Sequence, residues 1–306
     1  MKTVNWMNFE ETLREKTAQA EAVLQKFLPK EEGFQRTVTE AMNYSVLAGG
    51  KRLRPMLMAE TFRMFCGTGE MIEPFMAAIE MIHNYSLVHD DLPAMDNDEY
   101  RRGRKTTHVV YGEGMAVLAG DGLLNYAFET ACLAFEKAQD QEDYQRVARA
   151  LTVLAGKAGI YGMIGGQCAD IEAEEKQENV TGELLSFIHE HKTAALIQAA
   201  MMTGAILAGA DKEQIEAIEK CACNIGIAFQ IQDDILDVTG SQEVLGKPIG
   251  SDEKNNKKTY VTIYGLEKSA GMAAALSEEA IRILSSFPER NLFLEKLVEQ
   301  LVNREK

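Results

Sequence analysis

Apolar residues recur at helical spacing along almost the whole chain. The two-residue alternation typical of strands is nearly absent, and no Asn-Gly or Asp-Gly turn separates two alternating runs. Because no Ser- or Pro-rich linker interrupts the chain, residues 1–306 are predicted to form one all-α domain of about ten helices. The predicted helices are 8–28, 37–48, one that opens at Pro55, one from Pro74 to Asp91, 115–137, 142–162, 182–207, 212–238, 259–284 and 292–302.

The charge balance narrows the range of partners. The chain has 32 basic and 47 acidic residues, which gives a formal net charge of −15. Nucleic-acid-binding proteins and proteins bound to anionic membranes usually carry the opposite excess, so neither partner is expected. If the ligand is itself an anion, a local group of basic residues or a metal ion must hold it.

The sequence also predicts a cytoplasmic protein without a membrane span. The five cysteines include no C-x-x-C pair, which favours reduced thiols, and residues 1–15 lack the apolar core of a secretory signal. The segment 193–210 carries no charge, but it is rich in Ala and Gly and contains Thr193, Gln198 and Thr203. We therefore predict a buried core helix there rather than a transmembrane helix.

Two aspartate-rich segments, 90–96 (DDLPAMD) and 233–237 (DDILD), carry the strongest functional signal. Each follows an apolar helical run. Asp233 and Asp237 would lie about 40° apart on one helix face, where like charges repel. A divalent cation with carboxylate ligands would compensate them. A solvated acidic face is the alternative, but two such segments in one chain favour the metal.

The first segment differs from the second in its spacing. Position 94 is Ala, and the third carboxylate stands two residues later, at Asp96. Pro93 cannot continue a helix interior. We therefore expect a loop to return Asp96 toward Asp90.

Basic residues flank the aspartates. Residues 49–55 (GGKRLRP) place two glycines beside Lys51 and Arg54, and residues 101–105 (RRGRK) follow the first aspartate segment. Lys and Arg are suited to phosphate, and Mg²⁺ binds a few carboxylates together with substrate phosphates. The combination predicts a diphosphate ligand held partly through Mg²⁺.

Two nucleotide-binding fingerprints are excluded. Lys51 is followed by Arg52 rather than by Ser or Thr, so the glycine pair before it is not a P-loop. Glycines also recur every three residues at 156, 159, 162 and 165, without the spacing of a dinucleotide-binding motif. We interpret them as a small-residue face that lets helices approach closely.

In this order the segments resemble the trans-polyprenyl diphosphate synthase family, and the match covers nearly the whole chain. The proline-containing insertion in the first aspartate segment is most similar to bacterial farnesyl diphosphate synthases. The segments that carry the resemblance are GGKRLRP at 49–55, IHNYSLVHDD at 82–91, RRG at 101–103, GGQ at 165–167 with Asp170, HKT at 191–193 and FQIQDDILD at 229–237.

The resemblance implies an isoprenoid-synthase fold, a homodimer, and a central catalytic cavity with the aspartate segments facing across it. It implies Mg²⁺-dependent head-to-tail condensation of isopentenyl diphosphate with dimethylallyl or geranyl diphosphate, giving farnesyl diphosphate. A geranylgeranyl diphosphate synthase would have the same chemistry and a longer product. A non-catalytic subunit of a heteromeric prenyl synthase is a further alternative, but such subunits typically lose the aspartate segments that are intact here.

The resemblance also implies roles for individual residues. The metal would be held by Asp90, Asp96 and Asp233, with help from Asp91, Asp234 and Asp237. The allylic substrate would contact Arg101, Lys192, Thr193, Gln230 and Lys247. Isopentenyl diphosphate would contact Lys51, Arg54, His83 and Arg102. Of these residues, the implied catalytic set is Asp90, Asp96, Asp233, Lys192 and Arg101.

Product length is assigned to the helix before the first aspartate. Tyr85 and Ser86 would lie about 7.5 and 6 Å from Asp90 along the helix axis. A bulky ring there can block a growing tail, so Tyr85 favours the C15 product. His83 could instead be an ordinary core histidine, but its place two turns before Asp90 favours the site.

Overall fold

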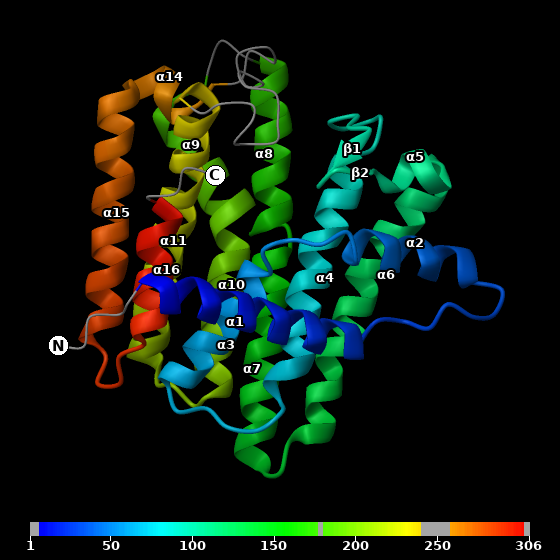
Figure 1. The fold of residues 1–306 in the computed structure, drawn as a ribbon, viewed down its shortest axis with the longest axis horizontal. Helices are drawn as coiled ribbons and strands as arrows, with labels where there is room; N and C mark the ends of the chain where they lie inside the picture. The colour runs from blue at the N-terminus through cyan, green and yellow to red at the C-terminus, as the bar shows by residue number, and fades with distance from the viewer. Residues whose placement is uncertain (1–5, 177–179, 240–257, 303–306) are drawn as a thin grey trace.

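The structure, a computed structural model, describes residues 6–176, 180–239 and 258–302, and almost all regular structure within these ranges is helical (Figure 1). The all-α prediction is confirmed. The α-helices are α1 (Trp6–Lys26), α2 (Arg36–Val46), α3 (Leu53–Met64), α4 (Ile72–Asp90), α5 (Thr107–Tyr111), α6 (Glu113–Cys132), α7 (Gln141–Ala158), α8 (Met163–Lys176), α9 (Gly182–Ile188), α10 (Ala195–Leu207), α11 (Lys212–Thr239), α14 (Tyr260–Tyr264), α15 (Leu266–Ser286) and α16 (Leu292–Val302).

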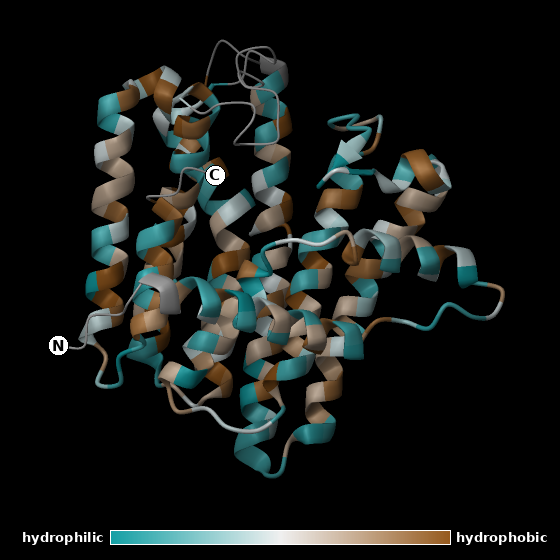
Figure 2. Cartoon of the chain, viewed as in Figure 1, coloured by the Kyte–Doolittle hydropathy of each residue, from teal (hydrophilic) through white to brown (hydrophobic). Residues whose placement is uncertain are grey.

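The long helices stand side by side, and α1 crosses in front of them in the view of Figure 1. Helices α4, α8 and α11 all end at the upper side in that view, where the short hairpin of β1 (Tyr100–Arg101) and β2 (Arg104–Lys105) also lies. Hydrophilic residues follow α1 and the turns at the lower end (Figure 2). The elements that carry the aspartate segments therefore meet at one end of the bundle.

Helix α10 lies at the centre of the bundle. All of its residues are buried, and it packs against α3, α4, α7 and α11. This confirms the prediction that the uncharged segment forms a core helix. Residues 141–174 are the one described stretch that is apolar and long enough to cross a membrane. Of the residues in its most apolar part, 33% are buried. The stretch comprises α7 and α8, with a turn between them. The absence of a membrane span stays a prediction.

The hairpin was not predicted, because its turn lacks the usual residues. Arg102 and Gly103 occupy the two turn positions with φ of 52° and 74°. Positive φ at both positions defines the type I′ turn of tight hairpins, which usually contains Asn-Gly. Arg102 is thus a non-glycine residue held in the left-handed region, a strain that often marks functional sites.

One predicted long helix contains an irregular turn, and another is interrupted. The stretch 182–207 is helical throughout, as predicted, and comprises α9, a π-helical turn (His189–Ala194) and α10. The stretch 259–284 is divided at Gly265, whose φ of 81° ends α14 before α15 begins. Helix α8 was not predicted as a separate element. These differences reflect backbone geometry that apolar periodicity does not encode.

The glycine repeat does not form the helix–helix face that we predicted. A Cβ at Gly162 would overlap the backbone of Lys157, so this glycine shapes the turn between α7 and α8. A Cβ at Gly165 would likewise meet the carbonyl oxygen of Ile160, whereas one at Gly156 would meet nothing within 4 Å. The repeat therefore lies at the break between two successive helices.

A buried arginine anchors the start of α3. The Arg52 side chain is fully buried, and its Nη1 pairs at 2.8 Å with Oε1 of Glu80 on α4. Its Nε pairs at 2.5 Å with Glu21 on α1, and its Nη2 donates to the carbonyl oxygen of Val46 at 2.7 Å. One guanidinium thus joins α1, α2 and α4 just after the Gly49-Gly50 pair.

We expect Arg52→Ala to reduce the free energy of unfolding by about 3–5 kcal/mol, because it leaves the Glu80 carboxylate buried without its partner. The matched control is Arg282→Ala, which removes an ion pair with Glu279 from a side chain that is 71% exposed. This exposed pair should contribute about 1 kcal/mol or less. Denaturant titration of both variants measures the difference, and equal losses would contradict the anchoring role.

Candidate functional site

The first aspartate segment closes on itself at the end of α4. The backbone N–H of Asp96 donates to the carbonyl oxygen of Asp90 at 2.8 Å, and the N–H of Asn97 donates to that of Leu92 at 3.1 Å. The chain therefore leaves the helix near Pro93 and returns Asp96 to Asp90, as predicted. The Asp96 side chain is exposed at this end of the bundle.

Asp90 carries a strongly perturbed carboxyl group. Burial raises its pKa to about 6, and the nearby carboxylates of Asp96 and Asp91 add to the rise. Lys192 and Arg101 act in the opposite direction without cancelling it. The Nε2 of Gln167 on α8 donates to Oδ1 of Asp90 at 3.0 Å. Negative charge is therefore under-compensated at Asp90.

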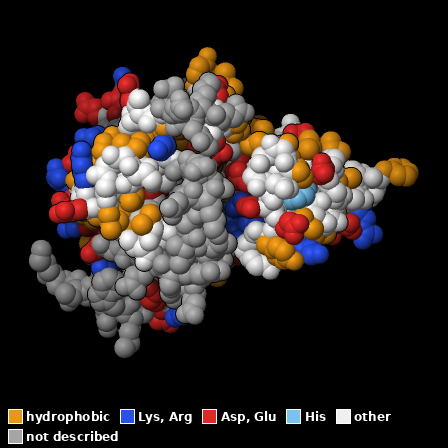
Figure 3. All heavy atoms as spheres, turned by 90° about the horizontal axis from the view of Figure 1, so that it is seen from above, with side chains coloured by type: hydrophobic (Ala, Val, Ile, Leu, Met, Phe, Trp, Pro, Cys, Tyr) orange, Lys and Arg blue, Asp and Glu red, His pale blue; other side chains and the backbone are white. Residues whose placement is uncertain are grey.

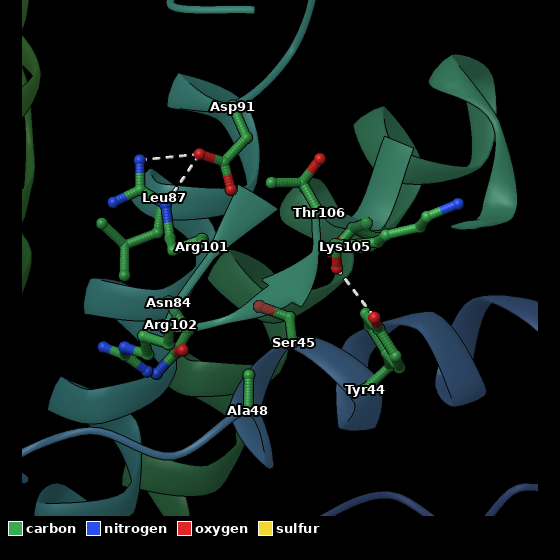
Figure 4. Close-up of a pocket in the computed structure, with 11 residues that line it drawn as sticks. Tyr44, Ser45, Ala48, Asn84, Leu87, Asp91, Arg101, Arg102, Lys105 and Thr106 are labelled. Carbon is green, nitrogen blue, oxygen red and sulfur yellow. Dashed lines mark hydrogen bonds and ion pairs between the residues drawn. The ribbon is translucent and has the colours of Figure 1, made fainter. Parts of the chain in front are cut away.

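Asp91 is paired with Arg101 of the hairpin (Figure 4). The Nε and Nη2 of Arg101 lie 2.7 and 2.6 Å from Oδ1 of Asp91. Burial nevertheless raises the pKa of Asp91. Burial also acts to lower the pKa of Arg101, but the neighbouring aspartates raise it, and the pKa of Arg101 is raised in total. Arg101, which the sequence assigns to substrate, is thus held at the first aspartate segment by a buried carboxylate.

Three of the residues predicted for isopentenyl diphosphate lie together. Burial lowers the pKa of Arg54 to about 10; the charge of Glu80 opposes this effect, and that of Arg102 adds to it. Burial lowers the pKa of His83 well below its usual value, and the charges of Arg54 and Arg102 lower it further. His83 is therefore neutral at pH 7. The buried Nε of Arg54 has no hydrogen-bond partner among the described residues.

The glycine pair gives Arg102 its place in this cluster. The guanidinium of Arg102 donates to the carbonyl oxygen of Gly49, and a Cβ at Gly50 would lie 2.9 Å from its Cζ. Any other residue at position 50 would displace Arg102. Lys51 follows in the same loop and is exposed. We call Lys51, Arg54, His83 and Arg102 the basic cluster.

Two pockets lie among the described residues. One has a volume of about 30 Å³ between α2, α4 and the hairpin, and Asp91, Arg101 and Arg102 belong to its lining (Figure 4). The other, of about 230 Å³, lies between α8 and α9 and is lined by Cys168 and Leu184 among others. Neither contains residues of both aspartate segments, so the central cavity between them stays a prediction.

Lys192 and Thr193 stand on the π-helical turn, and neighbouring helices hold both side chains. The Nζ of Lys192 lies 2.5 Å from Oδ2 of Asp170 on α8. The Oγ1 of Thr193 donates to Oε1 of Gln230 on α11 at 3.2 Å. The two predicted allylic contacts therefore project between α8 and α11.

The second aspartate segment lies on the last turns of α11. Asp233 and Asp237 are partly buried, whereas Asp234 is 4% exposed. The Oδ1 of Asp234 accepts from Nε2 of Gln230 at 3.3 Å, and its Oδ2 accepts from the N–H of Tyr260 at 3.0 Å. Asp234 thus holds the first residue of α14.

The predicted length-determining residues lie below Asp90 on α4. Tyr85 is 6% exposed, and its ring meets the edge of His89 at a centroid distance of 5.8 Å. Burial and the charge of Asp90 raise its pKa to about 12. The Oγ of Ser86 donates to the carbonyl oxygen of His83 at 2.9 Å. Tyr85 is thus a buried ring close to the first aspartate.

Some site residues were not predicted, and one predicted residue cannot be placed. Gln167 and Asp170, which hold Asp90 and Lys192, were given no role, although both belong to segments that carry the family resemblance. Lys247 lies outside the described residues. Within the described ranges, no three acidic, His or Cys side chains are grouped as a metal site. From above, basic and acidic side chains lie next to each other near the middle of the molecule (Figure 3).

Known proteins match the chain over nearly its full length. The family model described as polyprenyl synthetase matches residues 35–297. The chain is 43% identical to farnesyl diphosphate synthase of Geobacillus stearothermophilus, over 91% of this chain and 92% of that one. It is 42% identical to geranylgeranyl diphosphate synthase of Cyanophora paradoxa, over 95% of each. The crystal structure of a Helicobacter pylori geranyltransferase, complexed with magnesium and isoprenyl diphosphate, superposes with a TM-score of 0.79 at 31% identity, over 96% of each chain.

The raised pKa of Asp90 predicts a pH-dependent stability change. The folded state binds a proton that the unfolded state releases near pH 4, so stability falls as the pH rises toward 6. We expect metal-free Asp90→Asn to be more stable than wild type at pH 8, by on the order of 2–3 kcal/mol. The advantage should shrink below pH 6.

Thermal unfolding in chelator at several pH values measures this difference. Glu278→Gln, which makes the same carboxyl-to-amide change at an exposed position on α15, is the control and should show no such trend. A variant that is less stable than wild type at pH 8 would contradict an under-compensated charge at Asp90.

Proposed function

Because this chain belongs to the polyprenyl synthetase family, we propose that it is a Mg²⁺-dependent farnesyl diphosphate synthase. Prenyl chain elongation from isopentenyl and allylic diphosphates follows from the family itself. The finer proposal concerns the metal and the C15 product. The assignment of the C15 product is carried by one observation: the buried ring of Tyr85 lies five residues before Asp90 on the helix that delivers the first aspartate segment.

The basic cluster supports a site for isopentenyl diphosphate. Arg54, His83 and Arg102 face one another, and the charge of Glu80 does not offset the effect of burial on the pKa of Arg54 or Arg102. A diphosphate would supply the missing charge, and the buried Nε of Arg54 would gain an acceptor. Binding of the anion should also favour protonation of His83.

The acidic groups fit a magnesium ion. Mg²⁺ usually takes one or two protein carboxylates and fills its remaining positions with waters and substrate phosphates, so a preformed group of three acids is not required. Asp90 and Asp96 on one side and Asp233 on the other would hold it, since burial deprives the charge of Asp90 of solvation that a bound cation would replace. The magnesium in the similar Helicobacter enzyme supports this assignment. Bound Mg²⁺ would stabilise charge on the departing diphosphate.

The side chains around the allylic substrate have separate tasks. Lys192 and Arg101 would orient the allylic diphosphate and offset the charge that develops as its C–O bond ionises. Thr193 and Gln230, which bond each other, would line the same side. The double bond of isopentenyl diphosphate then forms the new C–C bond, and the departing diphosphate takes the proton that is lost. The apolar residues of α4 and α10 would exclude water, which would otherwise trap the cation.

Tyr85 would limit the product length. The allylic tail would run from the diphosphate at Asp90 along α4, and the ring of Tyr85 begins about 7.5 Å down that helix. The alternative, a geranylgeranyl diphosphate synthase, is favoured by relatives of that name at nearly the same identity. The homodimer and the cytoplasmic location stay predictions; Val117 and Leu118, exposed on α6, offer an apolar surface for a partner subunit.

The metal requirement is tested with Asp90→Ala and Asp233→Ala. Each should lower kcat by about 10²–10³-fold or more, because charge on the leaving group would lose its stabilisation. Product formation from isopentenyl and dimethylallyl diphosphates is measured during Mg²⁺ titration and in excess chelator. Glu278→Ala, an exposed acid on α15, should match wild type. Undiminished turnover in chelator would remove Mg²⁺ from the proposal.

The length assignment is tested with Tyr85→Ala. We expect wild type to make mainly C15 product and the variant to shift toward C20 while still condensing, because the small side chain leaves room for another isoprene unit. Chromatography of the dephosphorylated products measures the distribution. Tyr144→Ala, at an exposed position on α7, is the control. Mostly C20 product from wild type would favour the geranylgeranyl alternative, and an unchanged variant would show that Tyr85 is not the stop.

A further inference from the structure

The π-helical turn between α9 and α10 has an unusual setting. It spans His189–Ala194 and carries Lys192 and Thr193 on consecutive positions. A wide turn of this kind is rare, occurs mostly inside longer helices and often lies at a functional site. Its geometry must be held in place by neighbouring groups, and here α8 packs against one part of it and α11 against another.

On the side of α8, a glycine makes the contact. A Cβ at Gly166 would lie 2.7 Å from Cα of Lys192 and would overlap the backbone nitrogen of that residue. Real Cβ atoms essentially never approach so closely. Four residues later on the same face of α8, Asp170 pairs with Nζ of Lys192. The close approach at Gly166 brings Asp170 within reach.

Helix α11 contacts the π-helical turn in the same way, through a glycine and a polar side chain. A Cβ at Gly226 would overlap Cα and Cβ of Ala194, the last residue of the π-helical turn. Four residues later on the same face, Gln230 accepts the hydroxyl of Thr193. Each helix therefore contributes a glycine against the backbone of the turn and, one helical turn on, a polar group for one of its side chains.

We propose that Gly166 and Gly226 are positioning residues, which together clamp the π-helical turn so that Lys192 and Thr193 face the allylic substrate. Gln167, next to Gly166, donates to Asp90, so the same helix that holds Lys192 also fixes the carboxylate opposite it. A shift of α8 would move both groups. The catalytic part of this inference rests on the proposed function, whereas the clamp itself is a property of the fold.

The test compares four glycine-to-alanine variants. Gly166→Ala and Gly226→Ala insert a methyl group against the turn. Gly204→Ala also inserts one into a fully packed contact, against the carbonyl oxygen of Met58, but at the far end of α10. Gly156→Ala, on α7, places its methyl group in open space. Gly204→Ala controls for a loss of stability, and Gly156→Ala controls for the glycine-to-alanine substitution itself.

Steady-state kinetics should separate them. We expect both clamp variants to lower kcat by about 100-fold, the effect of a displacement of about 1 Å at a catalytic group. They should also raise KM for the allylic diphosphate while leaving KM for isopentenyl diphosphate within about twofold. Gly204→Ala should lower Tm without changing either KM, and Gly156→Ala should match wild type. If the clamp variants lose no more kcat than Gly204→Ala at a comparable Tm, the inference is wrong.

Two further measurements keep the test decisive. Amide hydrogen exchange of residues 189–194 should be faster in the clamp variants than in Gly204→Ala, and this readout does not depend on the reaction. An inactive wild type with accelerated exchange in the clamp variants would overturn the proposed function and leave the clamp standing. Unchanged exchange would overturn the clamp. Should a glycine variant fail to fold, Asp170→Asn keeps the shape of the α8 contact and should still raise the allylic KM; an unchanged KM would contradict the inference.

Discussion

The complete burial of α10 is the constraint on which the rest of this structure depends. A helix without a charged side chain that is surrounded by α3, α4, α7 and α11 gives the bundle an apolar centre. A charged group is costly there unless the protein pairs it. The turn that enters α10 carries Lys192 and Thr193, and it lies beside α8 and α11. Hydrophobic packing thus decides where an ionic reaction can take place.

Buried charge is treated differently inside and outside the candidate site. Arg52 is fully buried, but its guanidinium pairs with Glu80 and Glu21 and donates to the carbonyl oxygen of Val46. These partners raise the pKa of Arg52 in spite of burial. In the basic cluster, burial and like charges lower the pKa of Arg54 and His83. At Asp90, burial raises the pKa of the carboxyl group more than its basic neighbours lower it. The groups left electrostatically unsatisfied by the protein are those that an anionic substrate and a cation would complete.

Much of the fold and part of the site could be predicted because they depend on local pattern. Apolar periodicity gave most helices to within a few residues, and the proline after the first aspartates gave the return of Asp96. The π-helical turn and the hairpin could not be predicted in this way. Arg102 adopts positive φ where sequence rules expect Asn, and its place depends on Gly50, a residue 52 positions earlier. The roles of Gly166, Gln167 and Asp170 likewise depend on which helices become neighbours.

The contact between Asp234 and the N–H of Tyr260 has a consequence for how strain can travel through the molecule. It joins the last turns of α11 to the start of α14, and Asp234 also accepts a hydrogen bond from Gln230, which bonds Thr193 on the π-helical turn. A change that displaces the start of α14 should therefore be transmitted to the second aspartate segment and, through Gln230, to the turn that enters the central helix.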